Sequence, residues 1–273
     1  MKEQSRKLGE SIDHIRKTVP TRIRLAVVLG SGLGGFADSL PEPKVIETRD
    51  IPHFPRAGVV GHKGRLIFSC PDGVPVLAFQ GRSHIYESGD AGQAVYPIRV
   101  AHELGARIIV LTNAAGGVDR NLLPGDLMTI TDQLNLTGIP SFAAGIQGAR
   151  RGSLYSERLL KLADTVASSL GLRLHHGVYA CVKGPSYETP SEVGMVLRLG
   201  GDAVGMSTVF ESEMAASVGM EVLGISCITN MASGIRRQKL EHEEVTRVGQ
   251  KVQGDFSGLL RGIIKALSID KMP

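Results

Sequence analysis

One short segment near the amino terminus constrains the fold more than any other part of the chain. Residues 25–35, LAVVLGSGLGG, form an apolar run that breaks into a loop with four glycines and one serine, Ser31. The apolar, partly β-branched run predicts a buried strand. A glycine-rich turn after a strand exposes backbone N–H groups, and exposed N–H groups bind anions. We therefore expect a strand that leads into an anion-binding loop.

The spacing of Gly30, Gly32 and Gly35 also matches the G-x-G-x-x-G pattern of dinucleotide-binding loops. Such a site needs an acidic residue about 20 positions further on, at the end of a second strand, to hold the ribose. Glu47 and Asp50 lie at that distance, but their segment, KVIETRDIPHFP, contains prolines and makes a poor strand. A nicotinamide cofactor is therefore disfavoured, while a phosphate cradle and a purely structural tight turn both stay open.

Strand-like and helix-like segments alternate along the chain after this loop. Apart from an opening helix that stops at Pro20, the patterns predict strands at 65–69, 75–80, 107–111, 127–131, 177–182, 202–205 and 222–228, and helices at 93–104, 156–170, 190–199, 210–219 and 242–267. This alternation predicts a three-layer α/β fold, with a central mixed, largely parallel sheet flanked by helices. No linker or break in composition interrupts it, so we expect a single domain over residues 1–273.

Three of the predicted strands run into similar small-residue segments, GSGLGG, TNAAGG and TNMASG. Ligands of parallel α/β sheets bind at the carboxyl ends of the strands. We therefore expect these three segments to form neighbouring loops around one ligand site.

Composition narrows the classes of partner and compartment. With 42% hydrophobic and 21% charged residues, a chain of 273 residues can bury a sizeable core. The net charge of +4 comes without a dense basic tract, so we expect no nucleic-acid partner. No segment has the roughly 20 apolar residues that span a bilayer, and no signal peptide opens the chain, so we expect no membrane partner. Cys70, Cys181 and Cys227 lie far apart in apolar stretches, which predicts buried free thiols and a cytoplasmic protein.

The segment GRSHIYE carries polar side chains at alternate positions, Arg82, His84 and Tyr86. In extended backbone these three would share one face. Arginine offers a planar fork to phosphate oxygens, histidine a further donor, and tyrosine a hydroxyl on an apolar body. The alternative is an edge strand whose polar residues face water. His62, in VVGHKGR, is by itself more typical of a solvated loop histidine than of a catalytic one.

Chemistry suited to a heterocycle occurs in two later segments. Tyr187 and Glu188 lie in the Gly- and Pro-containing loop KGPSYETPSE, where an aromatic face can stack on a ring and a carboxylate can accept its N–H groups. The alternative for Glu188 is an acid favoured by the helix dipole. Asn230, after Thr229, can donate to a carbonyl and accept from an N–H. Met206, in VGMS, reads by default as core packing.

Taken in order, eight segments resemble the trimeric, low-molecular-mass purine nucleoside phosphorylases: LGSGLG, GHKG, GRSHIYE, TNAAGG, GPSYET, GDAVGMST, ITNMA and HEEV. Each segment is common by itself, but all eight in this order over nearly the whole chain are specific. The resemblance implies a purine/uridine phosphorylase-like fold and a homotrimer. It also implies reversible phosphorolysis of purine nucleosides to free base and ribose 1-phosphate, with orthophosphate as co-substrate and with no metal or organic cofactor.

The resemblance implies a role for each matching residue. The phosphate would be bound by Ser31, His62, Arg82, His84, Ser207 and the backbone N–H of Ala114. The ribose would be lined by Tyr86, Met206 and His242, with His242 near the 5′-hydroxyl. The purine would be bound by Ala115, Gly116, Tyr187, Glu188, Val204, Thr229 and Asn230. The residues implied to be catalytic are His84, Glu188 and Asn230.

Asparagine at position 230 suits 6-oxopurines, because a 6-amino group would need an acceptor beside it. We therefore expect inosine, guanosine and their deoxy forms as substrates in preference to adenosine. Two other functions stay open. A 5′-methylthioadenosine phosphorylase is disfavoured by Asn230, and a non-catalytic nucleoside-binding sensor would need no phosphate site built from Ser31, Arg82 and His84.

The sequence departs from the family pattern at three places. Phe210 stands where the family usually has a proline, and Tyr187 replaces the commoner phenylalanine. The segment QGARRGSLYSE lacks the phenylalanine that in this family reaches the active site of a neighbouring subunit. Phe142 and Tyr155 are the two candidates to replace it, and the sequence does not choose between them.

Overall fold

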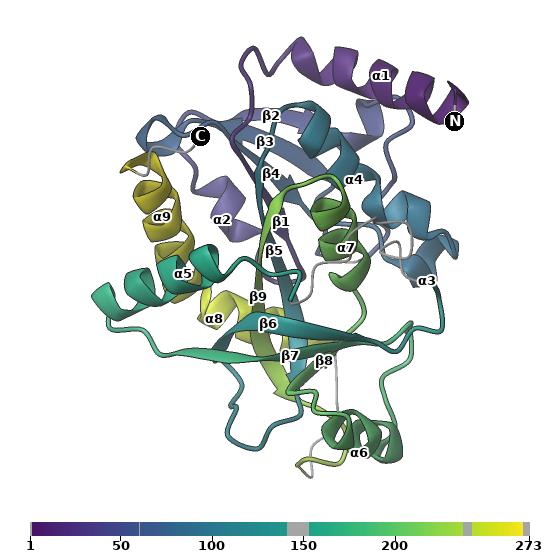
Figure 1. Ribbon diagram of the computed structural model, residues 1–273, viewed down its shortest axis with the longest axis vertical. Helices are drawn as coiled ribbons and strands as arrows, with labels where there is room; N and C mark the ends of the chain where they lie inside the picture. The colour runs from purple at the N-terminus through teal and green to yellow at the C-terminus, as the bar shows by residue number, and fades with distance from the viewer. Residues whose placement is uncertain (1, 60, 141–152, 237–241, 270–273) are drawn as a thin grey trace.

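The computed structural model describes residues 2–59, 61–140, 153–236 and 242–269 (Figure 1). Its strands are β1 Leu25–Leu29, β2 Lys44–Glu47, β3 Arg65–Ser69, β4 Val76–Gln80, β5 Ile108–Gly117, β6 Leu127–Asn135, β7 Leu174–Cys181, β8 Ala203–Gly205 and β9 Glu221–Met231. Its α-helices are α1 Lys2–Arg16, α2 Gly35–Asp38, α3 Ile85–Ser88, α4 Ala91–Glu103, α5 Glu157–Ser169, α6 Pro190–Arg198, α7 Val209–Ser217, α8 His242–Lys251 and α9 Gln253–Ile269. Two short 3₁₀ turns, Thr48–Asp50 and Pro71–Gly73, complete the described elements.

Helices cover both faces of a mixed sheet, which confirms the predicted α/β class (Figure 1). Successive residues of β1 point to opposite faces: Ala26 and Val28 pack into one core cluster, and Leu25, Val27 and Leu29 into another. The first cluster also takes buried side chains from α1, α4 and α7, and the second from α2, α5 and α9. A strand that is apolar throughout is therefore explained by burial on both faces.

The strand order is β2-β3-β4-β1-β5-β8-β7-β6-β9, and β5 also pairs with β9. The five strands from β5 to β9 therefore close on themselves, while β1 to β4 extend the sheet outward. Strand β1 runs parallel to both β4 and β5, and β5 runs parallel to β9. Strand β1 ends at Leu29, whereas β5 and β9 continue past it to Gly117 and Met231. The segment after β1 therefore lies beside the carboxyl-terminal half of β5, which pairs with that of β9, so the three segments are neighbours as the sequence predicts. The closure itself depends on the double pairing of β5, which the alternation of elements did not reveal.

The predicted loop at TNAAGG is wrong, because β5 continues through it to Gly117. The predicted loop at TNMASG is wrong over its first three residues, because β9 continues to Met231. Gly116 pairs with β8 on one side and β9 on the other, and the register with β9 shifts between Ala115 and Gly116. A Cβ atom on Gly117 would lie 3.1 Å from side-chain atoms of Ile228 and Met231. The small residues that looked like a loop therefore allow two neighbouring strands to approach closely.

Four other expectations need correction. The segment KVIETRDIPHFP, expected to make a poor strand, begins with the four-residue strand β2, which pairs antiparallel with β3 and ends at Glu47. The predicted helix over 242–267 is two helices, α8 and α9, separated at Val252. Cys70 is exposed rather than buried, whereas Cys181 and Cys227 are buried free thiols as expected. The segment GRSHIYE is not one extended stretch, because α3 begins at Ile85 and places Tyr86 on a helix.

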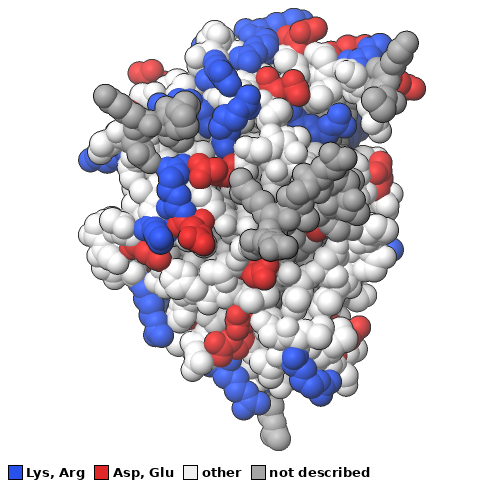
Figure 2. Space-filling view, viewed as in Figure 1, with Lys and Arg blue, Asp and Glu red and all other residues white. Residues whose placement is uncertain are grey.

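Charged side chains of both signs are interspersed over the face shown in Figure 2. Among the described residues, ion pairs join charges of opposite sign, such as Lys63 with Asp38 at 2.8 Å and Lys7 with Glu3 at 3.1 Å. This mixture fits the small net charge of the chain. Within the described residues, no helix combines the length and the apolar character needed to cross a bilayer.

Candidate active site

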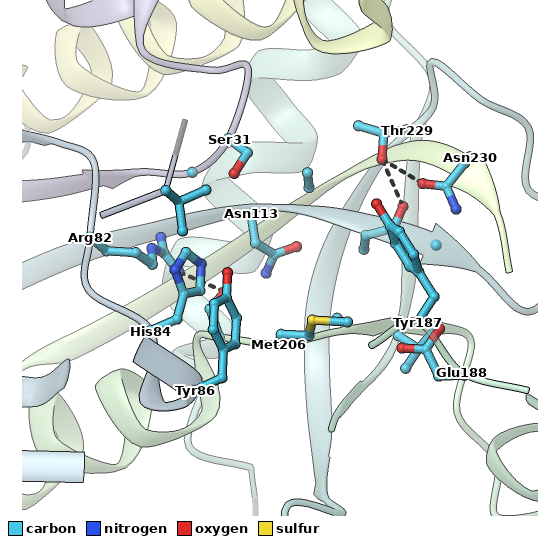
Figure 3. Close-up of a pocket in the computed structure, with 18 residues that line it drawn as sticks. Ser31, Arg82, His84, Tyr86, Asn113, Tyr187, Glu188, Met206, Thr229 and Asn230 are labelled. Atoms are coloured by element: carbon cyan, nitrogen blue, oxygen red, sulfur yellow. Dashed lines mark hydrogen bonds between the residues drawn. The ribbon is translucent and has the colours of Figure 1, made fainter. Parts of the chain in front are cut away.

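A pocket opens at the segment that follows β1 and the carboxyl-terminal halves of β5 and β9 (Figure 3). Its lining comes from strands β5, β8 and β9, from helix α3, from the segment after β1 and from the loops before β3, α3, α6 and α7. The lining residues are Gly30, Ser31, Val59, Arg82, His84, Tyr86, Asn113, Ala114, Ala115, Gly116, Tyr187, Glu188, Val204, Gly205, Met206, Ser207, Thr229 and Asn230. In Figure 3, Ser31, Arg82, His84 and Tyr86 lie toward one end, and Tyr187, Glu188, Thr229 and Asn230 toward the other. Parallel strands thus deliver chemically different side chains to the two ends of one cavity.

The structure brings nearly all of the sequence-predicted site residues to this pocket. Those that line it are Ser31, Arg82, His84, Tyr86, Ala114, Ala115, Gly116, Tyr187, Glu188, Val204, Met206, Ser207, Thr229 and Asn230. His62 is not among the lining residues, and its ring lies 5.3 Å from the ring of His84, which is. His242 begins α8, but its side chain lies outside the described residues.

At one end of the pocket, His62 and Ser31 form a hydrogen bond. Nε2 of His62 lies 3.1 Å from the Ser31 hydroxyl, and Nδ1 lies 2.9 Å from the carbonyl oxygen of Arg82. Burial, followed by the proximity of His84, lowers the pKa of His62 to about 4. His62 is therefore neutral at pH 7, with Nδ1–H donating to the carbonyl and Nε2 accepting from Ser31.

His84 is held at the start of α3 by Glu87. One carboxylate oxygen accepts from the backbone N–H of His84 at 2.6 Å and lies 3.0 Å from its ring Nδ1. The other oxygen accepts from the backbone N–H of Gly58 at 2.7 Å. The His84 ring in turn stacks on Tyr86, with centroids 4.9 Å apart and planes 11° from parallel. Glu87 thereby fixes both the histidine and the loop that carries Val59 into the pocket.

Arg82 is anchored by protein groups and is only 3% exposed. Its Nη1, which carries two N–H groups, lies within hydrogen-bonding distance of three acceptors: Ser207 Oγ at 2.9 Å, Thr208 Oγ1 at 3.1 Å and Glu211 Oε2 at 2.9 Å. Its Nη2 donates to main-chain carbonyls of β1 and β5. The sequence predicted that this fork faces phosphate oxygens, whereas here both terminal nitrogens bind the protein. Nε is buried without a partner among the described residues.

At the opposite end, Glu188 and Asn230 are each 9% exposed, while Tyr187 is 42% exposed. Burial raises the pKa of Glu188. The Thr229 hydroxyl donates to Asn230 Oδ1 at 2.9 Å, and Asn230 Nδ2 donates to the carbonyl of Met231 at 3.2 Å. These bonds orient the amide of Asn230. A buried carboxylate, an oriented amide and an accessible ring suit a flat heterocycle that carries both donors and acceptors.

Several residues of the site were missed from the sequence. Gly30 and Asn113 both line the pocket, and they lie so close together that a Cβ on Gly30 would be 2.8 Å from the Cα of Asn113. Asn113 belongs to TNAAGG, so attention to polar residues in that segment would have found it. Thr208 and Glu211 hold Arg82, and their T-x-x-E spacing is a capping-box signal for the start of α7.

Phe210 and Tyr155 can now be placed. Phe210 is 2% exposed and packs with Ile85 and Val95 of the neighbouring helices, so it fixes the start of α7 against them. Tyr155 is 3% exposed, and its hydroxyl donates to Gln133 at 2.8 Å, so it is buried within its own chain. Phe142 lies outside the described residues. In the part of the chain that the structure describes, no cluster of three His, Cys, Asp or Glu could hold a metal ion.

Comparisons with known proteins agree with this geometry. The family model of the phosphorylase superfamily matches residues 24–265. The chain is 42% identical over 267 residues to purine nucleoside phosphorylase 1 of Geobacillus stearothermophilus, covering 96% of this chain and 97% of the relative. It is 43% identical over 256 residues to purine nucleoside phosphorylase 1 of Bacillus subtilis, covering 92% and 94%.

Solved structures show the same similarity. A Schistosoma purine nucleoside phosphorylase in complex with hypoxanthine superposes with a TM-score of 0.86, at 34% identity and with 97% of both chains covered. A Schistosoma mansoni purine nucleoside phosphorylase in complex with inosine superposes with a TM-score of 0.85, at 32% identity, covering 98% of this chain and 97% of that one.

Proposed function

Because the chain belongs to the purine nucleoside phosphorylase family, we propose that it transfers the pentosyl group of 6-oxopurine nucleosides to orthophosphate. The products are the free base and ribose 1-phosphate or its deoxy form, and the reaction is reversible. The observation that carries this proposal is one pocket with a cluster of hydroxyl, imidazole and guanidinium groups at one end and Glu188 with Asn230 at the other. Orthophosphate is a co-substrate, and no metal or organic cofactor takes part.

Phosphate is bound at the end formed by Ser31, Arg82, His84 and Ser207, with the backbone N–H of Ala114. His62 supports that end through Ser31. Tyr86 and Met206 line the pocket between the two ends, where the ribose lies, and His242 belongs near its 5′-hydroxyl. Holding phosphate and nucleoside in one cavity turns a bimolecular attack into a positioned one. These placements are supported by the lining of the pocket and by the matching motifs.

The reaction breaks the glycosidic C–N bond and leaves its electron pair on the purine. Positive charge develops on the sugar, and the phosphate dianion stabilises that charge and then bonds to the anomeric carbon. Asn230 hydrogen-bonds N7 as that nitrogen gains a proton and supports the charge at O6, while Glu188 accepts from N1–H. Groups fixed before the reaction are effective because they do not reorganise as charge develops. The hydrogen bonds of Asn230 to Thr229 and Met231 are such a fixation.

The proposal also covers the substrate preference, the oligomeric state and the cellular location of the protein. Asn230 favours inosine and guanosine over adenosine and disfavours 5′-methylthioadenosine. The polar phosphate end is not needed by a nucleoside-binding sensor, which disfavours that function. A homotrimer is supported by the resemblance to the trimeric family. A cytoplasmic location is supported by three free cysteines.

Release of hypoxanthine from inosine tests the proposal directly. The purified protein is incubated with inosine, with and without added phosphate, and the base and sugar products are separated by chromatography. We expect hypoxanthine and ribose 1-phosphate only when phosphate is present. Release of hypoxanthine with free ribose in the absence of phosphate would identify a hydrolase, and absence of release under both conditions would favour a sensor.

A further inference from the structure

Behind the phosphate end of the pocket lies a buried ion pair, Arg82 with Glu211. The two side chains are 2% and 5% exposed, and Nη1 lies 2.9 Å from Oε2. Arg82 lines the pocket, whereas Glu211 lies on α7 and does not reach it. Burial raises the pKa of Glu211, and Arg82 opposes this rise. Any effect of Glu211 on the pocket must therefore act through its neighbours or through its charge.

A single carboxylate oxygen of Glu211 holds two neighbours. Oε2 accepts from Arg82 Nη1 at 2.9 Å and from the backbone N–H of Thr208 at 3.0 Å. Thr208 has a φ of +76°, which is strained for a residue with a β-branched side chain. Glu211 therefore fixes Arg82 and also the backbone that directly follows Ser207. Two N–H donors on one oxygen are the surroundings of an ionised carboxylate.

Hydrogen bonds connect Glu211 to residues that line the pocket. Thr208 Oγ1 lies 3.1 Å from Arg82 Nη1 and accepts from Asn113 Nδ2 at 2.9 Å. The hydroxyl oxygens of Thr208 and Ser207 lie 3.2 Å apart, and Ser207 Oγ accepts from Arg82 Nη1 at 2.9 Å. Glu211 is therefore connected to Ser207, which lines the pocket, through Arg82 and through the backbone of Thr208.

We propose that Glu211 is a positioning residue of the phosphate site, which orients Arg82 and Ser207 and whose negative charge limits the affinity for phosphate. This inference rests on the proposed function, because it assigns the Arg82 end of the pocket to orthophosphate. The guanidinium charge is already balanced by a carboxylate, so an incoming dianion meets a site of low net charge. The hydrogen bonds of Glu211 thus favour phosphate binding by holding Arg82 and Ser207 in place, whereas its negative charge opposes phosphate binding. Two substitutions at this residue separate the two effects.

Glu211→Gln keeps a hydrogen-bond acceptor beside Arg82 and Thr208 and removes the negative charge. A glutamine Oε1 placed where Oε2 now lies can still accept from Arg82 and from the N–H of Thr208. We expect the KM for phosphate to fall at least threefold, while the KM for inosine stays within twofold. An unchanged or higher KM for phosphate would overturn the proposal. Glu221→Gln, which removes one carboxylate charge at the start of β9 where Glu221 pairs with Arg158, is the matched control and should change neither KM.

Glu211→Ala removes the hydrogen-bond acceptor as well as the negative charge. Arg82 and Thr208 both lose their acceptor, so we expect the KM for phosphate to rise at least tenfold. A purely structural role for Glu211 would give two less stable variants with the same KM for phosphate as the unsubstituted enzyme. Opposite changes in KM for the Gln and Ala variants are therefore the distinguishing result.

A second comparison covers the case in which Glu211→Gln does not fold, since it leaves a buried guanidinium unpaired. Removing both members of a buried pair is better tolerated than removing one. We expect the double variant Arg82→Met/Glu211→Gln to have a lower KM for phosphate than the single variant Arg82→Met. In the single variant the carboxylate of Glu211 has lost the counter-charge of Arg82. Equal values would overturn the proposal. Failure of the unsubstituted enzyme to consume phosphate would instead refute the proposed function, so the two failures are distinguishable.

Discussion

Gly30 carries the loop that leads into the phosphate end, and its replacement by alanine gives the most direct test of how that loop is built. A Cβ atom at position 30 would lie 2.8 Å from the Cα of Asn113 and 2.9 Å from the carbonyl oxygen of Thr112. Both atoms belong to the backbone of β5, which cannot move aside without disturbing its pairing with β1 and β9. Gly30→Ala must therefore separate two adjacent strands at their carboxyl ends.

The magnitude follows from this overpacking. Inserting a methyl group into a well-packed region costs about 1–3 kcal/mol, and we expect about 2 kcal/mol here because both contacts are with backbone. For a chain of this size, that corresponds to a Tm lower by about 4–8 °C. Ser31 directly follows Gly30 and lines the pocket, so the same shift should raise the KM for phosphate by about tenfold or more, a loss of about 1.4 kcal/mol or more.

Calorimetry and steady-state kinetics measure the two effects. Gly258→Ala is the matched control, because position 258 lies inside α9 and the nearest atom to a new Cβ is 3.8 Å away. That substitution should stabilise the protein by about 0.5–1 kcal/mol through helix propensity and leave both KM values unchanged. Gly30→Ala with an unchanged Tm, or with equal increases in both KM values, would refute the reasoning.

Three further predictions concern the base end and His62. Asn230→Asp supplies an acceptor for a 6-amino group, so the ratio of kcat/KM for adenosine to that for inosine should rise at least tenfold; an unchanged ratio would contradict the assigned contact. Glu188→Gln should lower kcat/KM for inosine by about 100-fold, or about 3 kcal/mol. Because burial raises the pKa of Glu188, kcat/KM should also fall on acidification at a pH above the ordinary range for glutamate, and this fall should be absent from the variant. The pKa of His62 is lowered to about 4 in the folded protein. Between about pH 6.5 and 4 the unfolded state therefore binds a proton at this histidine that the folded state does not. The free energy of unfolding should decline by about 3 kcal/mol as the pH falls through that window. Urea unfolding of His62→Gln should show a smaller decline, and an identical pH dependence would rule out this contribution.

Local pattern was sufficient for much of the fold. Strands β3 and β4 lie where the apolar runs at 65–69 and 75–80 predicted strands, and they pair antiparallel across the short turn at Pro71–Gly73, with Leu66 opposite Phe79. Helices α5 and α6 each begin next to a side-chain cap, Ser156 and Thr189, that the sequence displays. Such features depend on neighbours within a few residues, so the sequence contains the whole cause.

Other elements depended on partners distant in the chain. Gly116 and Gly117 look like a loop until β8 and β9 pair with them on opposite sides. Tyr86 belongs to a short helix whose first residue is preceded by His84 and stabilised by Glu87. A short segment has too few residues to express a period, so its conformation follows from the contacts that surround it.

The sequence by itself determined the α/β class and the neighbouring position of the segments that follow or end three strands, because order and residue type along the chain carry that information. Most of the residues that line the pocket were implied by the resemblance to a known family. The roles of those residues in binding and catalysis stay predictions. Only the tertiary structure decided that Arg82 is held by Glu211 and Thr208. Those groups lie more than 120 positions away, and no local pattern records which buried donor meets which acceptor.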